Sequence, residues 1–375
     1  MALGITEWTI LLITIAFGIL VILFTIQMIR YHKTAWSFLI SLTFGFLAGL
    51  VAIINELFFS SYTNISNFFQ SLHLNLYGLH FFFFYIFFEQ LISKKLNSIR
   101  LSIMTGFLII QTIGLWQVFY CRVNSLNADI AWVLADIGYW TPALFVYLGM
   151  GSVIYIKTYI YTKEKMPIIL FVALVFVSFG FIISLLNDMY FILNVFTISI
   201  PKPDLINDLS NYANIFPFIG IIMFVITYLS NINYLYRLPN DNYLLMVLEK
   251  SGTPLYSVRF KTRKKINVEE VLLSGMISAI NNVFKEIFKE ETAISEISSK
   301  RLSILMETGE KTVALLITDK VTYFLDKALI LFLKNFELKF QKEIKNDVRD
   351  LMVFEKATEL LAPIFPFFII EKVSE

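Results

Sequence analysis

Two histidines and three carboxylates lie inside or at the ends of long apolar segments, where an ionisable side chain is costly to place. His73 and His80 belong to one segment, and their spacing of seven residues puts them on the same face of a helix. Asp136, Asp188 and Glu56 lie near the ends of three other segments. Imidazole and carboxylate groups bind polar ligands, exchange protons or ligate metals. One metal ion cannot join the two imidazoles, because their spacing separates them by about 10 Å along the helix axis.

The elements that carry these groups are long apolar segments. The chain has 375 residues, is 57% hydrophobic and has a mean hydropathy of +0.70, which is far more apolar than an average soluble protein. A run of about 20 apolar residues is long enough to cross a bilayer as a helix. The runs lie at about 8–29, 36–58, 71–92, 101–120, 131–156, 167–187 and 211–232. The sequence therefore predicts a multi-pass protein of the cell membrane with a seven-transmembrane α-helical bundle.

Positive charge alternates between the loops of this bundle. The loops after the first, third and fifth runs hold most of it: Arg30 and Lys33, then Lys94, Lys95 and Arg100, then Lys157, Lys163 and Lys165. The alternate loops hold only Arg122 and Lys202. Because basic loops stay on the cytoplasmic side, we expect the N-terminus outside and the last third of the chain in the cytoplasm.

Under this topology the ionisable groups of the spans gather toward the outer leaflet. Aromatic side chains follow Asp136 at similar depth. We predict a pocket at the outer mouth of the bundle for a small extracellular or membrane-borne ligand of unknown identity. Its candidate residues are Glu56, His73, His80, Asp136, Tyr139, Trp140 and Asp188. The alternative is interfacial anchoring, since Trp, Tyr and His are frequent at headgroup level and carboxylates at span ends are often hydrated.

Three further residues in the spans favour structural roles. Glu89 lies at the inner end of the third run, close to Lys94 and Lys95, and is predicted to form an ion pair that fixes this helix end. Pro142 and Pro217 are candidates for helix kinks.

The charge density changes near residue 240. Residues 1–240 hold 11 Lys/Arg and 9 Asp/Glu, whereas residues 241–375 hold 20 of each. We therefore divide the chain into a bundle (1–235), a linker (236–242) and a cytoplasmic domain (243–375). The near-zero net charge of each part argues against a nucleic-acid partner. The single cysteine, Cys121, excludes an intrachain disulfide and a cysteine metal cluster.

The periodicity of the last third predicts a small α+β domain with the order β-β-α-β-β-β-α-α. The strands are expected at 243–250, 255–262, 294–298, 302–307 and 311–318, and the helices at 267–290, from Asp319 to 344, and at 347–361. No phosphate-binding loop, dinucleotide fingerprint or zinc-protease motif is present in the sequence. We therefore expect no enzyme, no cofactor and no metal site.

Two resemblances follow from particular stretches. The segment from Phe38 to Lys95, with VAIINELFF and NFFQSLHLNLYGLHFFFFYIFFEQL, resembles the seven-helix N-terminal sensor region of archaeal and bacterial histidine kinases. Glu56 and Glu89 match two glutamates of that region. The chain departs from those kinases because no histidine follows His80, so it has no cytoplasmic phosphoacceptor. A retinal protein is also disfavoured, because the seventh run lacks a lysine.

The second resemblance concerns residues 243–375. The hairpin LEKSGTPLYSVRF followed by LLSGMISAINNVFKEIF resembles the longin and roadblock-like domains, which have profilin-like folds and are abundant in archaea. This resemblance implies a protein-interaction module that docks a small GTPase or dimerises. Combined with the bundle, it predicts a membrane sensor or receptor-like protein in signal transduction. A passive membrane anchor for the adaptor domain and a transporter remain the alternatives.

Overall fold

The computed structural model describes residues 5–31, 35–196, 198, 201–230, 240–262, 269–288, 294–346 and 351–365. These residues form two compact units. The first comprises Met1–Glu89 and Leu96–Pro239, and the second comprises Gln90–Lys95 and Asn240–Glu375. Linker residues 236–239 lie outside the described residues.

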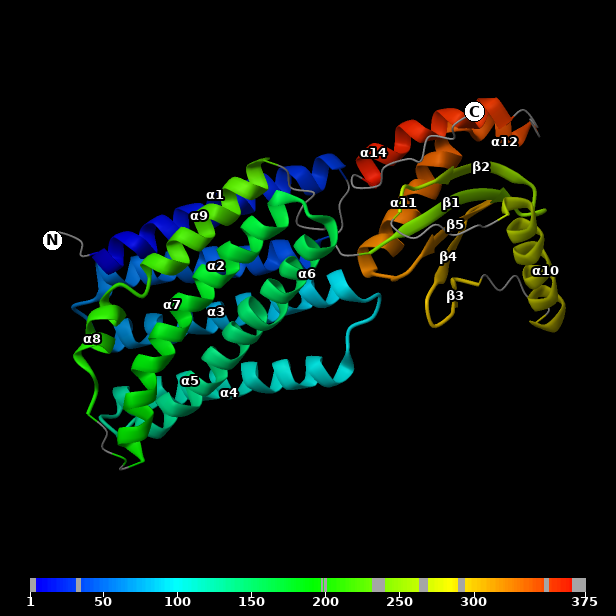
Figure 1. The fold of residues 1–375 in the computed structure, drawn as a ribbon. Helices are drawn as coiled ribbons and strands as arrows, with labels where there is room; N and C mark the ends of the chain where they lie inside the picture. Colours follow the sequence, from blue (N-terminus) through cyan, green and yellow to red (C-terminus); the bar gives the residue numbers. More distant parts are fainter. Residues whose placement is uncertain are drawn as a thin grey trace. The chain divides into compact units, whose positions relative to one another are not determined.

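The first unit is a bundle of long helices that run side by side (Figure 1). Its elements are α1 Ile5–Tyr31, α2 Trp36–Ile54, π-helix η1 Asn55–Phe59, α3 Thr63–Ile92, α4 Ser98–Val123, α5 Asp129–Leu144, π-helix η2 Phe145–Ser152, α6 Val153–Thr162, α7 Lys165–Val195, α8 Asp204–Asn211 and α9 Ile215–Ser230. Within the described residues, seven helical segments are long and apolar enough to cross a membrane. The seven long apolar helices expected from the sequence are therefore present.

The helices α3 and α7 extend beyond the apolar runs that predicted them. The segment 59–70, between the second and third runs, is mostly helix, because α3 begins at Thr63, and α7 ends at Val195, eight residues beyond the run 167–187. The first turns of α3 are polar, so counting apolar residues placed its start too late. Pro217 lies in the first turn of α9, where no intrahelical N–H bond is lost. The kink expected at Pro217 is therefore not supported.

Pro142 lies inside α5, three residues before the π-helix η2. Proline has no N–H to donate to the preceding turn. The wider π turn then continues to Ser152, whose hydroxyl donates to the backbone oxygen of Tyr147 at 2.8 Å. This change of helical register rotates the residues of η2 relative to α5, and it determines where Tyr147 enters the bundle.

Glu89 forms a bidentate ion pair with Arg100 of α4. The Glu89 side chain is fully buried, whereas Arg100 is partly exposed. The sequence-based prediction named Lys94 and Lys95 as the partners; the structure instead pairs Glu89 with an arginine on the next helix. The planar guanidinium explains this choice, because it can contact both carboxylate oxygens at once.

The second unit is an antiparallel five-stranded sheet with the order β2-β1-β5-β4-β3. Its strands are β1 Asn242–Glu249, β2 Pro254–Arg259, β3 Glu296–Ser298, β4 Ser303–Thr308 and β5 Thr312–Thr318. The two central strands, β1 and β5, are almost entirely buried. A central strand that is covered on both faces is apolar along its whole length, which matches the sequence of these two strands.

Alternate residues of the sheet enter two separate cores. Leu245, Val247 and Leu316 pack with α11 Tyr323–Lys339 and with the C-terminal short helices. On the other face, Met246 and Leu315 pack with α10 Glu270–Phe288. The helices α10 and α11 therefore cover opposite faces of the sheet (Figure 1).

The C-terminal helices differ from expectation at their ends. α11 begins after Thr322, whose hydroxyl accepts a bond from the Leu325 N–H at 3.3 Å. Asp319 was predicted to open this helix; its carboxylate instead accepts a bond from the Asp241 N–H at 3.0 Å. The helix predicted at 347–361 consists, in its described part, of α13 Leu351–Phe354, 3-10 helix η4 Glu355–Leu360 and α14 Leu361–Ile364; α12 Gln341–Lys345 precedes them.

Glu337 of α11 holds the turn between β4 and β5. Its carboxylate accepts bonds from the N–H groups of Glu310, Lys311 and Thr312 and from the Thr312 hydroxyl, at 2.7–3.3 Å. Partial burial raises the pKa of the Glu337 carboxyl, but the hydrogen bonds from Thr312 and the two neighbouring backbone groups together lower it below its usual value. Hydrogen bonds to an ionised acceptor are the stronger ones.

We expect protection of the 310–312 amides from hydrogen exchange to depend on pH. A lowered pKa means that the ionised carboxylate stabilises the turn above the unfolded pKa of about 4.3. This stabilisation is lost as the pH falls through the folded pKa. Exchange of the full-length protein, corrected for intrinsic rates, should show this loss, and Glu337→Gln should remove it. If Glu337→Gln keeps the same pH dependence, while the exposed control Glu355→Gln behaves as wild type, another group holds the turn.

Candidate ligand cavity in the helix bundle

A cavity of about 210 Å³ lies between four helices of the first unit. We call it the Asp136 cavity. Its lining combines polar, aromatic and aliphatic side chains from α3, α4, α5 and α7. The lining residues are Gln70, His73, Leu74, Gln111, Leu115, Trp132, Ala135, Asp136, Tyr139, Trp140 and Asp188.

Helix periodicity and small residues bring these groups together. Asp136, Tyr139 and Trp140 are spaced three and four residues apart, so they share one face of α5. Two glycines let α4 and α5 approach closely: a Cβ atom at Gly138 would lie 2.5 Å from the backbone nitrogen of Gln111, and one at Gly114 would lie 2.7 Å from that of Ala135. Close backbone contact at glycine is typical of packed membrane helices. The cavity wall therefore depends on both glycines.

Asp188 is held by its neighbours. Its carboxylate accepts a bond from the Trp140 indole N–H at 2.9 Å and one from the Asn187 amide at 3.1 Å. The Lys202 ammonium in turn donates to the Asn187 side-chain oxygen. These contacts fix Asp188 and the Trp140 ring as parts of the cavity wall.

Two other polar groups of the same wall, the Gln111 amide and the Asp136 carboxylate, lack some or all of their hydrogen-bond partners. The Gln111 side chain is 1% exposed, and its amide nitrogen donates to the Leu74 backbone oxygen at 2.8 Å. Its other amide atom, Oε1, is buried and has no hydrogen-bond partner in the structure. The half-buried Asp136 carboxylate has no hydrogen bond or ion pair with the described residues. An unpaired buried acceptor costs about 1–3 kcal/mol, but Gln111 Oε1 packs against Gly78 of α3, where a Cβ atom would lie 2.3 Å from it, and this glycine does not line the cavity. The Asp136 carboxylate is therefore the open acceptor of the cavity wall.

His73 and Arg122 lie at the edge of this arrangement. The His73 Nδ1 atom is 3.2 Å from the Phe69 backbone oxygen, so it carries the proton and donates to that acceptor. Arg122 donates to the side-chain oxygens of Asn67 and Gln70, and its guanidinium lies 5.0 Å from the centre of the Trp132 ring. The Arg122 charge is thus engaged on polar side chains and on an aromatic face.

The structure gathers five of the seven predicted site residues in one cavity wall: His73, Asp136, Tyr139, Trp140 and Asp188. Glu56 is exposed, lies in η1 and is not part of this wall. His80 lies farther along α3, where it is 2% exposed and lines a different cavity.

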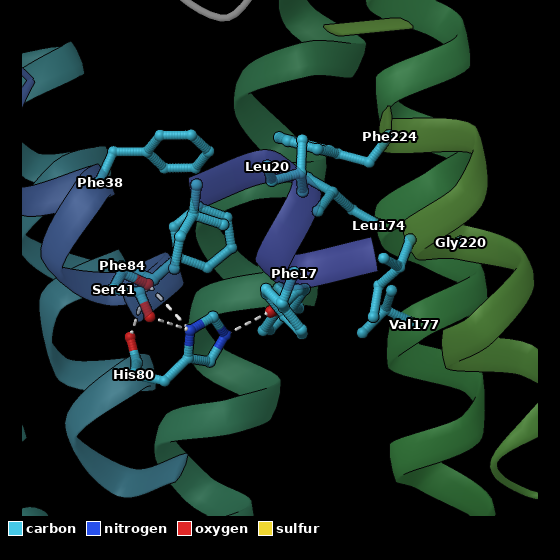
Figure 2. Close-up of a pocket in the computed structure, with 13 residues that line it drawn as sticks. Phe17, Leu20, Phe38, Ser41, His80, Phe84, Leu174, Val177, Gly220 and Phe224 are labelled. Atoms are coloured by element: carbon cyan, nitrogen blue, oxygen red, sulfur yellow. Dashed lines mark hydrogen bonds between the residues drawn. The ribbon is translucent and has the colours of Figure 1, made fainter. Parts of the chain in front are cut away.

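His80 joins three helical elements at the centre of the bundle, with Ser41 beside it (Figure 2). Its Nδ1 atom lies 2.9 Å from the Ser41 backbone oxygen, and its Nε2 atom lies 2.7 Å from the Tyr147 hydroxyl. A carbonyl only accepts, so Nδ1 donates and Nε2 accepts from tyrosine. The Ser41 hydroxyl also donates to the His80 backbone oxygen at 3.0 Å. A neutral imidazole satisfies every contact.

The cavity beside His80 is small, about 30 Å³, and is lined mainly by apolar side chains such as Phe17, Leu20, Phe224 and Val177. That volume has room for about one water molecule. We therefore assign His80 a structural role that connects α2, α3 and η2, in contrast to its predicted place in the ligand pocket.

Four residues that define these two cavities are absent from the residues predicted from the sequence: Gln70, Gln111, Ser41 and Tyr147. The prediction considered ionisable residues and the aromatic residues next to them, and these four belong to neither group. The run 101–120 contains two glutamines, Gln111 and Gln117, and these were the available signal, because uncharged polar groups in such runs also need partners.

Comparisons with protein-family models, curated proteins and solved structures give no match. Among the described residues, no group of three or more His, Cys, Asp and Glu side chains is arranged to hold a metal ion. The candidate site is therefore defined by its own geometry.

We expect Tyr147→Phe to destabilise the bundle by about 1–3 kcal/mol, because it leaves the buried Nε2 atom of His80 without a donor. The measurement is the unfolding free energy of the full-length protein in detergent. In a His80→Leu background the same substitution should cost much less, since both partners are then gone. Equal costs in the two backgrounds would show that the bond between Tyr147 and His80 contributes nothing.

Proposed function

We propose that this protein is a membrane-embedded sensor whose seven-helix bundle binds a small ligand from the outer side and passes the bound state to a cytoplasmic protein-interaction module. The observation that carries the proposal is the Asp136 cavity, in which the Asp136 carboxylate has no partner among the described residues and aromatic side chains form much of the wall. A bundle that served only as an anchor has no need of a cavity of about 210 Å³ between four helices. The resemblance to the sensor regions of histidine kinases agrees with this role.

Aromatic contacts connect the cavity with the centre of the bundle. The Tyr139 ring, in the cavity wall, lies 5.2 Å from Phe81, and Phe81 lies 6.1 Å from Tyr147. Tyr147 belongs to η2 and bonds His80. A ligand that moves Tyr139 therefore acts on a packed chain of rings that ends at the junction of α2, α3 and η2. We propose that two arrangements of this junction differ in ligand affinity, as any such switch requires.

The second unit supports the interaction role in this proposal. It has the element order β-β-α-β-β-β-α on which the resemblance to longin and roadblock-like domains rests. An apolar stripe is exposed on α10: Leu272 is 68% exposed, Met276 42% and Val283 52%. With the exposed Ala279, the residues follow spacings of four, three and four, which is the pattern of a helix–helix seam.

We propose that a second copy of the chain covers the α10 stripe. The seam is apolar throughout and has a small residue near its middle, so two copies of it can pack against each other as a self-complementary contact. A small GTPase is the alternative partner, because the resemblance implies either.

A transporter is the second alternative for the bundle, after the passive anchor. The π-helix η2, with Gly149 and Gly151, interrupts one span, and interrupted spans are common in transporters. Movement of a ligand across sealed vesicles distinguishes a transporter from a sensor, which binds its ligand without accumulating it.

Filling the cavity tests the relay without knowledge of the ligand. Ala135 is buried in the cavity wall, so Ala135→Leu occupies part of the space that a ligand would take. We expect this variant in nanodiscs to change hydrogen exchange in β1–β5 or α10 by about fivefold or more, the usual lower range of coupling between sites.

The matched control is Leu134→Phe, which enlarges a neighbouring side chain on the exposed side of α5. It should leave the exchange rates of the second unit unchanged. If neither substitution changes the hydrogen exchange rates of the second unit, this result contradicts the relay and favours the passive anchor.

The dimer is tested by cross-linking. Ala279→Cys is introduced into full-length protein that also carries Cys121→Ser, and a short bismaleimide is added. We expect a covalent dimer from Ala279→Cys and little from Glu355→Cys, which is exposed on the side of the sheet opposite α10. If neither cysteine variant gives a covalent dimer, a second copy does not cover this stripe, and a different protein is left as the partner.

A further inference from the structure

We infer that the ligand of the Asp136 cavity is a small organic ammonium ion with an apolar or aromatic body. This inference rests on the proposed function, since it names the ligand class of the same cavity. It is carried by the charge of the wall and by the aromatic lining with its volume.

The charge of the wall favours a cation. Asp136 and Asp188 are two carboxylates in one cavity, and only Asp188 is held by hydrogen bonds from Trp140 and Asn187. The cations near this region are engaged elsewhere: Arg122 on Asn67, Gln70 and the Trp132 ring, and Lys202 on Asn187. An anionic ligand would be repelled by Asp136, whereas a cation completes an ion pair with it inside the bundle.

The remaining walls suit the body of such a ligand. Trp132, Tyr139 and Trp140 line the cavity with aromatic surface, and aromatic faces attract ammonium ions. A cavity of about 150 Å³ holds benzene. The Asp136 cavity, at about 210 Å³, therefore accepts a phenyl ring with a short aminoalkyl chain. A metal ion does not explain the site, since no group of metal ligands is found among the described residues.

The test is titration calorimetry of the full-length protein in nanodiscs, with empty nanodiscs subtracted to correct for partition into lipid. Three probes share one phenyl body: 2-phenylethylamine as the cation, 2-phenylethanol as the neutral isostere and 3-phenylpropionate as the anion. We expect saturable binding of the amine, with at least about tenfold weaker binding of the alcohol and none of the anion.

Two variants locate the bound amine. Asp136→Asn keeps the shape of the side chain but removes the charge, and it should weaken amine binding about tenfold or more. Asp208→Asn changes an exposed carboxylate on α8 and should leave the affinity unchanged. Thermal unfolding in detergent verifies that each variant is folded.

Each result supports or overturns the ammonium assignment. Tighter binding of the alcohol or the anion, or amine binding that is insensitive to Asp136→Asn, overturns it and leaves the cavity as a site for another ligand class. Absence of binding by all three probes overturns it as well. The relay is judged separately, because the exchange experiment with Ala135→Leu requires no ligand.

Discussion

The structure of the bundle depends on one constraint: a polar atom inside an apolar helix bundle must find a partner there, because lipid offers none. Glu89 meets this constraint through Arg100, and His80 meets it through Ser41 and Tyr147. Both are ionisable groups with a complete set of contacts, so they connect helices. Asp136 differs, since it lines the cavity and its carboxylate has no hydrogen bond or ion pair with the described residues. This open carboxylate distinguishes Asp136 from Glu89 and His80.

The sheet of the second unit is stabilised by apolar packing on both of its faces. Alternation of side chains along β1 and β5 supplies two cores at once, one against α10 and one against α11. With both faces covered, the exposed apolar surface of this unit includes the outer side of α10, where Leu272 is 68% exposed. Exposed apolar stripes of this kind mark interaction surfaces, which is why the proposed partner is placed on α10 and not on the sheet.

Much of the fold was predictable because it depends on local pattern. Apolar length alone located seven helices, and alternation located five strands within a few residues. Helix ends were less predictable: the polar start of α3 at Thr63 and the cap at Thr322 depend on contacts that periodicity does not register. The candidate site was predictable only in part. Depth in the membrane grouped Asp136 with Asp188, but it could not separate His80, whose partners Ser41 and Tyr147 come from distant helices.

The central claim is that the open carboxylate of the Asp136 cavity binds an ammonium group. The most direct measurement is a crystal structure of the full-length protein with 2-phenylethylamine. The account predicts the amine nitrogen about 2.7–3.2 Å from an Asp136 carboxylate oxygen, with the phenyl ring against Tyr139 or Trp140. A saturated crystal in which the amine lies elsewhere, with Asp136 bonded only to water, would contradict it.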